Sequence, residues 1–402
     1  MNIKKLTLKD YRSYKDRTFE FSDNVNILVG KNAQGKTNVL EAIFFMILGK
    51  SFKTSKEKEV ISWDEESAYI KGEFQKTYRD IEIEMFFDKN HKKSVKIDGI
   101  SIKKIGELMS QVNGVFFSPD ELKLIKESPE ERRRFMNVVL SQTNKRYFYM
   151  LGRYEKVLAN RNKLLKECKS IDTVKETIEI WDRALSEFAQ KIYIERENFI
   201  KEITPFAIKA HEYISGGREN IKIEYKSSFS GQDYCEKMMK SLAKNLEKDF
   251  KLGFTTVGVH RDEIDIYLND VEVKTYGSQG QQRTVALSLK LAELEFIKNK
   301  TGEYPILLLD DVFSELDEGR RRKLLNFTSK TQTIITCTEF NEDLDKINGK
   351  IFKIEKWLKN NEITTKFRYL FICNYIMFIH MIVLIEKSKW CKKKTIWNKH
   401  IT

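Results

Sequence analysis

The fold of this 402-residue chain is decided by the stretch Gly30-Lys31-Asn32-Ala33-Gln34-Gly35-Lys36-Thr37. Residues 24–29 before it have the composition of a strand, and residues 38–48 after it form an apolar run long enough for a buried helix. Strand, glycine-rich loop and helix in this order predict a P-loop. A glycine-rich turn that fits the pattern by chance is the alternative, and the flanking strand and helix argue against it.

Each part of this loop suits triphosphate binding. The glycines let backbone N–H groups approach the phosphates, Lys36 reaches the β and γ oxygens, and the hydroxyl of Thr37 can ligate Mg²⁺. The following helix adds free N–H groups and the positive end of its dipole. We therefore expect ATP and Mg²⁺ as cofactors. The predicted ATP-binding residues are Gly30, Lys31, Asn32, Ala33, Gln34, Gly35, Lys36 and Thr37.

The composition is basic. The chain has 72 Lys and Arg against 59 Asp and Glu, a net charge of +13 and an isoelectric point near 9.2. This balance favours a polyanionic partner, of which nucleic acid is the commonest. Each local cluster is equally compatible with a solvated face. The clusters are Lys50, Lys53, Lys56 and Lys58; Lys92, Lys93 and Lys96; and Arg132, Arg133 and Arg134.

The cysteines and the N-terminus indicate a cytoplasmic protein. The five cysteines are scattered and have no paired spacing, so neither a disulfide framework nor a zinc site is predicted. The first residues are charged and alternating rather than an apolar core with a cleavage site, so no secretory signal is predicted.

The first third of the chain predicts strands. Residues 3–29 contain short alternating runs that lead into the P-loop, and three further runs predict an antiparallel sheet beside the nucleotide site: 67–74, 81–87 and 94–99. Tyr11 or Tyr14 could stack on a base, although half-buried sheet aromatics are the commoner case. Residues 112–117 predict another apolar strand.

A helical section follows. Ser128-Pro129-Glu130-Glu131 combines an N-cap, a proline at the first helical position and a glutamate three residues after the cap. Apolar residues recur at helical intervals over 129–214, with a break at 170–173 that indicates a turn. We therefore predict an antiparallel helical arm, followed by a short strand at 221–225 and one more helix over 236–250.

The apolar run 305–309 leads directly into Asp310-Asp311. A buried strand that ends in acid can deliver a carboxylate rigidly to the metal bound by a P-loop, so Asp310 is the predicted Mg²⁺ ligand with Thr37. Asp311 is the predicted catalytic residue, because its carboxylate could polarise an attacking water. Paired aspartates after a strand can also form only a helix-capping turn.

A second anion nest is predicted where Tyr276-Gly277-Ser278-Gln279-Gly280-Gln281-Gln282-Arg283 opens a helix. One γ-phosphate does not need two such nests from the same chain. The economical hypothesis is a head-to-tail dimer in which this nest contacts the ATP of the partner subunit. The predicted residues in trans are Ser278, Gly280, Gln281 and Gln282, with Ser314 and Asp317 of the D-loop across the dimer axis.

This combination resembles the ABC ATPase superfamily, specifically its SMC-like branch, and over residues 1–355 it is similar to the RecF family of bacterial recombination mediators. The motifs that carry the resemblance are residues 276–284, 308–317, Phe117-Ser118-Pro119-Asp120 and 128–135. Val259 and Phe52 depart from the residues common in that family, proline and histidine. No Q-loop glutamine is evident, and Asp120 stands near that place.

The resemblance implies a cytoplasmic DNA-repair ATPase that dimerises on ATP and binds single- and double-stranded DNA. It also implies partnership with RecR and RecO in loading RecA at gaps, in replication restart and in the SOS response. A weak, DNA-stimulated ATPase acting as a switch is expected, without a membrane partner.

The predicted fold class is α/β: an ABC-type P-loop ATPase head with an antiparallel β subdomain and an inserted antiparallel, coiled-coil-like helical arm. The predicted domains are the N-terminal half of the head (1–127), the arm (128–250), the C-terminal half of the head (251–358) and an atypical tail (359–402).

The tail contains an apolar run, 369–385, followed by lysines. Three interpretations compete: a membrane-surface anchor, a helix packed on the head, and the product of a reading-frame change.

Two other function classes also remain. One is the ATP-hydrolysing subunit of a transporter, against which the long helical arm argues. The other is a structural SMC-type protein, for which the arm is short.

Overall fold

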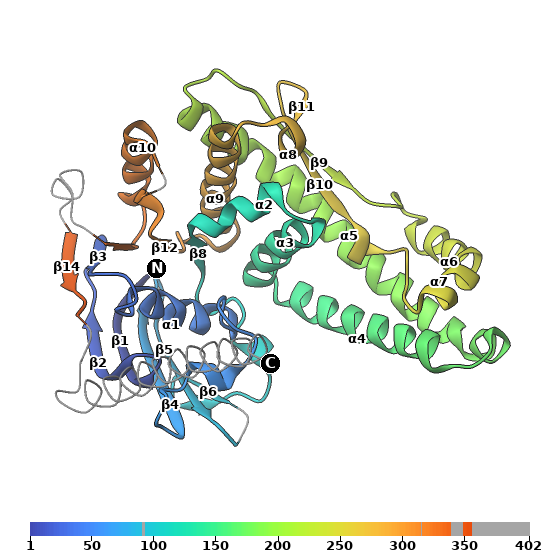
Figure 1. Ribbon diagram of the computed structural model, residues 1–402, viewed down its shortest axis with the longest axis horizontal. Coiled ribbons are helices and arrows are strands. Elements are labelled where there is room, and N and C mark those ends of the chain that lie inside the picture. The colour runs from blue at the N-terminus through green and yellow to red at the C-terminus, as the bar shows by residue number, and fades with distance from the viewer. Residues whose placement is uncertain (91–92, 315, 339–348, 356–402) are drawn as a thin grey trace, which may run out of the picture. The chain divides into compact units, whose positions relative to one another are not determined.

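The computed structural model describes residues 1–90, 93–314, 316–338 and 349–355 (Figure 1). Residues 1–355 form one compact unit. The predicted tail domain and its apolar run at 369–385 lie outside the described residues.

A parallel sheet carries both halves of the predicted ATP site. Its strand order is β14-β3-β13-β12-β8, and every neighbouring pair is parallel. The strands are β3 (Val25–Val29), β8 (Gly114–Phe117), β12 (Ile306–Asp310), β13 (Thr333–Cys337) and β14 (Gly349–Lys353). Because parallel strands end at the same edge, the residues that follow β3, β12 and β13 meet there.

An antiparallel sheet with the order β2-β1-β4-β5-β6-β7 confirms the predicted β subdomain. Its strands are β1 (Asn2–Tyr11), β2 (Tyr14–Glu20), β4 (Ser67–Gln75), β5 (Asp80–Asp88), β6 (Ser94–Ile97) and β7 (Ile100–Ser101). The alternation of buried and less buried residues along β4 and β5 follows the period of two in their sequences.

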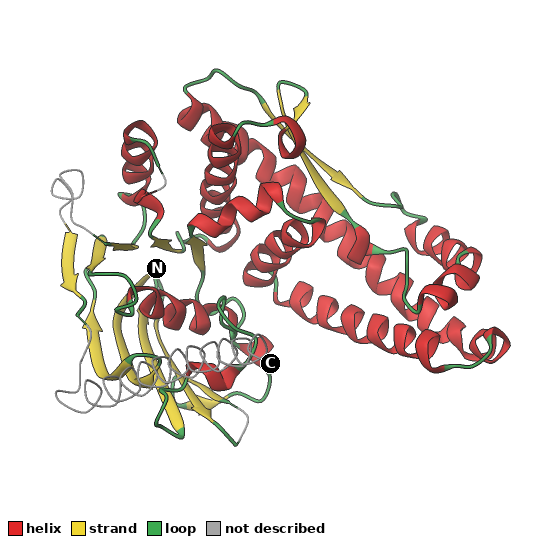
Figure 2. Cartoon of the chain, in the orientation of Figure 1, coloured by secondary structure: helices red, strands yellow, loops and turns green. Residues whose placement is uncertain are grey.

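Helices dominate the section after β8, as Figure 2 shows. The α-helices are α1 (Lys36–Leu48), α2 (Lys123–Lys126), α3 (Pro129–Thr143), α4 (Lys145–Glu167), α5 (Ile171–Ser215), α6 (Tyr234–Lys244), α7 (Leu246–Leu252), α8 (Val273–Tyr276), α9 (Gln279–Thr301) and α10 (Glu318–Thr328). A small antiparallel sheet has the order β11-β10-β9, with β9 (Ile221–Lys226), β10 (Glu263–Leu268) and β11 (Val271–Glu272).

The parallel sheet is covered on both faces. Ile306 and Leu308 of β12 belong to a core shared with α1 and the antiparallel sheet. Leu307 and Leu309 belong to a second core shared with α3, α5 and α9. This alternation explains why the strand is a continuous apolar run, since each face is buried against a different layer.

The turn between the long helices is confirmed. α4 ends at Glu167, and α5 begins at Ile171 behind Ser170, whose side chain accepts a hydrogen bond from the N–H of Thr173. The helix predicted over 236–250 is two helices, because the chain leaves helical geometry at Asn245. The side chain of Asn245 donates to the carbonyl of Ser241 at 2.8 Å and competes with the helical pattern.

Residues of the predicted arm pack against elements of the head on the other side of the predicted boundaries. The boundaries themselves stay a prediction. The half of α5 near Ile203 lies in the same core as α9, and β9 pairs with β10 along its whole length. The small cluster of Leu165, Val174 and Ile178 is separate from that core and lies where α4 meets α5. The helical section is therefore anchored in the head at its base, and only its far end has a core of its own.

Candidate ATP site

The predicted P-loop connects β3 to α1. Glycine is required at position 30 because there is no room for a side chain, and at position 35 because of the backbone conformation. A Cβ at Gly30 would lie 2.2 Å from the carbonyl oxygen of Ile354, and Gly35 has φ +104°, which side chains rarely adopt. The hydroxyl of Tyr14 donates to the carbonyl of Gly35 at 3.1 Å, so the neighbouring sheet supports the loop.

Lys36 is oriented along the loop. It is 7% exposed, and its Nζ donates to the carbonyls of Gly30 at 2.5 Å and Lys31 at 3.0 Å. Burial lowers the pKa of Lys36, and the carboxylates of Asp311 and Asp310 partly oppose this effect. Its ammonium group therefore lies inside the loop, where the lysine of a P-loop binds the oxygens of a triphosphate.

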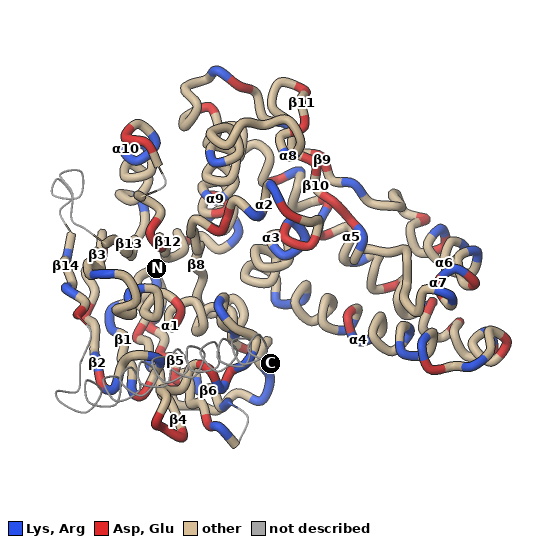
Figure 3. The backbone as a smooth tube through the Cα atoms, in the orientation of Figure 1, with Lys and Arg blue, Asp and Glu red and all other residues tan. Residues whose placement is uncertain are grey.

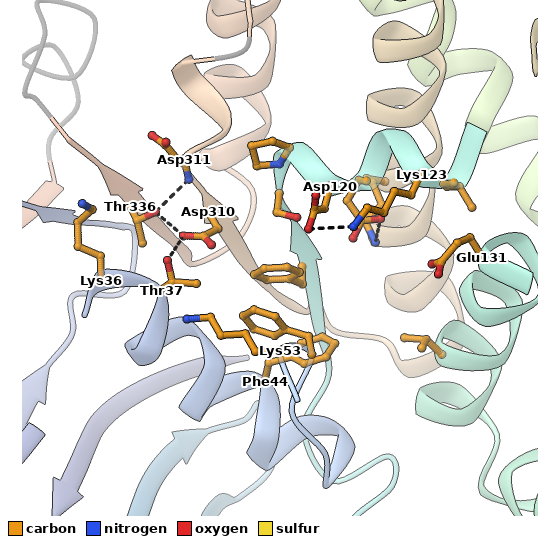
Figure 4. A pocket seen from close by; sticks show the side chains of 18 of the residues that line it. Lys36, Thr37, Phe44, Lys53, Asp120, Lys123, Glu131, Asp310, Asp311 and Thr336 are labelled. Atoms are coloured by element: carbon orange, nitrogen blue, oxygen red, sulfur yellow. Dashed lines mark hydrogen bonds and ion pairs between the residues drawn. The ribbon is translucent and has the colours of Figure 1, made fainter. Parts of the chain in front are cut away.

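Asp310 faces the P-loop helix, and its role as an Mg²⁺ ligand stays a prediction. Its Oδ1 accepts from the hydroxyl of Thr37 at 2.9 Å and from that of Thr336 at 2.7 Å (Figure 4). Adjacent oxygen ligands of an octahedral Mg²⁺ lie about 2.9 Å apart, since each bond is about 2.0–2.1 Å. The oxygens of Thr37 and Asp310 therefore fit a shared Mg²⁺, which prefers hard oxygen ligands.

Asp311 begins a sharp turn directly after β12. Its φ is +52°, an unfavourable value for a residue with a side chain, and its N–H donates to Oγ1 of Thr336 at 3.0 Å. The hydroxyl of Ser314 donates to the carbonyl of Asp311 at 2.7 Å. Asp311 lines the same cavity as Asp310, although its carboxylate points away from Thr37 in Figure 4. Backbone strain of this kind is common at catalytic residues.

A cavity of about 880 Å³ opens beside these residues. The P-loop, Asp310 and Asp311 line one part of it, and Asp120 lies on another wall. Asp120 thus lines the same cavity as Thr37 and Asp310, and its place near the Q-loop position stays a prediction. Phe52, which replaces the histidine common in the resembling family, stacks on Phe116 with ring centroids 4.1 Å apart.

The second predicted anion nest, at the start of α9, does not line this cavity. Ser278 is the N-cap of α9: its Oγ accepts from the N–H of Gln281 at 3.2 Å, and the Gln281 side chain accepts from the N–H of Ser278 at 2.8 Å. A hydroxyl that accepts one bond can still donate its proton. Among the described residues that line the 880 Å³ cavity, Ser278, Gly280, Gln281 and Gln282 are absent.

The two glutamines of this nest also have partners inside the chain. Gln282 is buried and donates to the carbonyl of Val273 at 3.2 Å, while Gln281 donates to Glu219 at 2.9 Å. Ser278 and Gly280 are thus the nest residues best placed for an external anion. All four assignments in trans remain predictions.

Arg320 joins the D-loop to this nest. Its guanidinium donates to the carbonyl of Gly280 at 3.2 Å and to the hydroxyl of Thr284 at 3.0 Å, and it pairs with the carboxylate of Asp317. Asp317 also caps α10 by accepting from the N–H of Arg320 at 2.9 Å. Ser314 is exposed.

Two sequence interpretations are decided by burial. Tyr11 is fully buried and Tyr14 is 7% exposed, so both are sheet aromatics rather than exposed stacking platforms.

Sequence analysis missed Thr336, which lies between the P-loop strand and Asp310. A polar residue near the end of the apolar run Thr333–Cys337 was the available signal.

Residues 2–356 match the family of RecF/RecN/SMC N-terminal domains. The chain is 43% identical over 358 residues to the DNA replication and repair protein RecF of Clostridium perfringens, covering 88% of this chain and 98% of that protein. It is 44% identical over 363 residues to RecF of Ruminiclostridium cellulolyticum, with the same coverage.

The chain belongs to the RecF family. A solved structure of the recombination mediator protein RecF-ATPrS in the RecFOR pathway is similar, with a TM-score of 0.81, 36% identity and coverage of 88% of this chain and 96% of that one. The head of an Smc protein bound to the C-winged helix domain of ScpA shares the fold, with a TM-score of 0.52 and 17% identity over 85% and 91% of the two chains.

These similarities confirm the predicted ABC-type ATPase head, and RecF-family membership does not favour the transporter interpretation. ATP as a ligand of this family is supported by a second solved structure, RecF-ATP, with a TM-score of 0.80 and 36% identity. In the part of the chain that the structure describes, no helix is both long and apolar enough to cross a bilayer.

Proposed function

We propose that this RecF-family chain is an ATP-gated DNA clamp of replication and repair, assembled as a homodimer when each subunit binds ATP and released by hydrolysis. Thr37 and Asp310 hold Mg²⁺ and Lys36 binds the β and γ phosphates. Asp311 positions the attacking water as general base. Magnesium would neutralise charge on the phosphates as the γ-phosphoryl group is transferred to water and ADP leaves.

One observation carries the proposal. The P-loop, Asp310 and Asp311 line one cavity, whereas the nest that begins at Ser278 lies outside it and is joined to the D-loop through Arg320. A half-site that exposes a second anion-binding surface is completed most simply by another copy in head-to-tail orientation. Nucleotide binding then controls association, because the bound phosphates contribute to the interface.

The wider role follows from family membership. The proposed partners are single- and double-stranded DNA, RecO and RecR, with RecA loading at gaps as the outcome in repair, replication restart and the SOS response. The similar solved structures are of recombination mediators in the RecFOR pathway. We also propose a cytoplasmic location.

The test of the enzymatic part is the rate of ATP hydrolysis with and without gapped duplex DNA. We expect slow turnover that DNA accelerates and that Lys36→Ala abolishes. A rate that DNA leaves unchanged would contradict the DNA-gated part of the proposal, while hydrolysis by Lys36→Ala would locate the activity in a contaminant.

A further inference from the structure

Three cations of the basic clusters found in the sequence are used inside the chain. Arg132 is 3% exposed and forms a bidentate pair with Glu263, with distances of 2.6 and 2.8 Å. Arg133 donates to the carbonyl of Asp262 at 2.8 Å, and Lys93 pairs with Glu57. These cations hold elements together, so they are poor candidates for binding an external polyanion.

A different basic surface runs along α4. Tyr147, Tyr154, Arg161 and Leu165 form its buried face. Lys145, Lys156 and Lys163 are exposed and, at 3.6 residues per turn, fall within about 20° of one another on the opposite side of the helix. We call these three lysines the α4 basic face. Figure 3 shows basic residues recurring along this helix.

The residues between these lysines leave them accessible. Gly152 and Ala159 lie on the same side of the helix by the same periodicity and are both exposed. A Cβ built on Gly152 would have no heavy atom within 4 Å. The lysines are therefore separated by small residues that do not screen a long, flat partner.

The lysines of the α4 basic face have few ion-pair partners. Within the residues that the structure describes, Lys145 and Lys156 form no ion pair, and Lys163 has only Glu167, at 3.9 Å. On α5, Lys175, Arg183 and Lys201 each pair with a carboxylate three or four residues before it, at 3.3, 3.1 and 3.0 Å. The exposed Lys191 and Lys209 of α5 have no ion pair among the described residues. Lys145 and Lys156 can therefore contact an external anion without breaking an ion pair inside the chain.

We propose that the α4 basic face binds the phosphodiester backbone of duplex DNA. Lys145 and Lys163 are 18 positions apart, about 27 Å along a helix at 1.5 Å per residue. This length matches roughly eight base pairs at about 3.4 Å each. Lysines on a rigid helix contact phosphates without reading sequence, so binding is independent of sequence. The inference rests on the proposed function, since it assigns the surface that holds the DNA.

The experiment measures the affinity for a 30-base-pair duplex as a function of salt, with Mg²⁺ and ATP. The variant is the triple substitution Lys145→Ala, Lys156→Ala and Lys163→Ala, because alanine favours helix. We expect affinity at least about tenfold lower and a log–log salt slope reduced in magnitude by about 2 to 3, since each phosphate contact contributes about 0.9.

The matched control is Lys175→Ala, Arg183→Ala and Lys201→Ala, which removes the same charge from exposed positions on α5. We expect it to bind like the unaltered chain. A further variant, Lys145→Arg, Lys156→Arg and Lys163→Arg, keeps the charge and should keep the salt slope, which separates lost contacts from lost folding.

Two results would overturn the inference while leaving the DNA clamp intact: wild-type affinity and slope in the α4 alanine variant, or equal losses in the α4 and α5 variants. Failure of the unaltered chain to bind duplex DNA would overturn both the inference and the proposed function.

Discussion

Oγ1 of Thr336 lies 2.7 Å from Oδ1 of Asp310, so a hydroxyl on β13 fixes the carboxylate at the end of β12 that we propose as a metal ligand. The same hydroxyl accepts from the N–H of Asp311 at 3.0 Å. One side chain therefore contacts both acidic residues, for which we propose different roles. A hydrogen-bond partner of a metal ligand contributes by fixing that ligand's orientation.

Replacing this hydroxyl should weaken metal binding. Thr336→Val keeps the shape but removes the bonds to Asp310 and Asp311, so we expect about 10- to 100-fold more Mg²⁺ to be needed for half-maximal hydrolysis. A Mg²⁺ titration of the ATPase rate measures this. Thr333→Val on the same strand is the control, because the side-chain hydroxyl of Thr333 bonds only to the carbonyl of Thr331 among the described residues. Equal Mg²⁺ dependence in both variants would refute the role of Thr336.

Substitutions at Lys36 and Asp311 should separate ATP binding from hydrolysis. Lys36→Ala removes the cation that the loop holds, so we expect ATP binding to be lost. Asp311→Asn keeps the size of the side chain but removes the base, so ATP should bind and the dimer should persist. Nucleotide binding by fluorescence and single-turnover hydrolysis measure the two steps. If Asp311→Asn hydrolysed ATP at the normal rate, Asp311 would not be the base.

The thiol beside the P-loop should react slowly. Burial raises the pKa of Cys337 to about 11, which the Asp311 carboxylate favours and Lys36 partly opposes. Only the thiolate is nucleophilic, so alkylation should be slow at pH 8 and rise about tenfold per pH unit up to pH 10. Peptide mass spectrometry should show the half-buried Cys168 modified first. Equally fast labelling of the two at pH 8 would contradict this.

Stability should fall in acid because of His260. Its Nε2 lies 3.1 Å from the carbonyl of Thr255 and must donate, and its Nδ1 lies 2.6 Å from the hydroxyl of Tyr154, from which it accepts while the ring is neutral. Burial lowers the pKa of His260 to about 4. Its contribution to stability is complete above about pH 6.5 and is lost as the pH falls toward 4, by at most roughly 3 kcal/mol.

Urea denaturation between pH 4 and 7 checks this effect. In His260→Asn the titrating ring is absent, so the free energy of unfolding should fall less steeply over the same window. Parallel curves for the two proteins would show that other groups cause the acid sensitivity.

The parts of the site that were predictable from sequence are local. The P-loop consists of consecutive residues, so its glycines, lysine and threonine can be recognised in one stretch of sequence. Asp310 ends a strand that is predicted from the apolar composition of that strand. Thr336 was missed because its importance depends on β13 lying between β3 and β12 in the sheet, an order that no single segment contains. Arg320 was missed for the same reason, since its contact with Gly280 joins residues 40 positions apart.

The helical section shows what helical periodicity can predict from sequence and what it cannot. Periodicity predicted α4, α5 and their turn, because the apolar positions of each helix repeat within its own sequence. It did not predict that Ile203 and its neighbours pack into the core of α9, since long helices of an extended arm would show the same pattern. The basic face of α4 escaped notice because its lysines are 11 and 7 positions apart and form no cluster in sequence.

The most direct test of the central claim is sedimentation of the protein with Mg²⁺ and ATP, alongside Ser278→Arg. This substitution puts a large side chain at the exposed start of α9, where the nucleotide of a partner subunit would be contacted. The account predicts a dimer that requires ATP, disappears on removal of the nucleotide and fails to form in Ser278→Arg. A protein that stays monomeric with ATP, or a dimer that Ser278→Arg leaves unchanged, would contradict it.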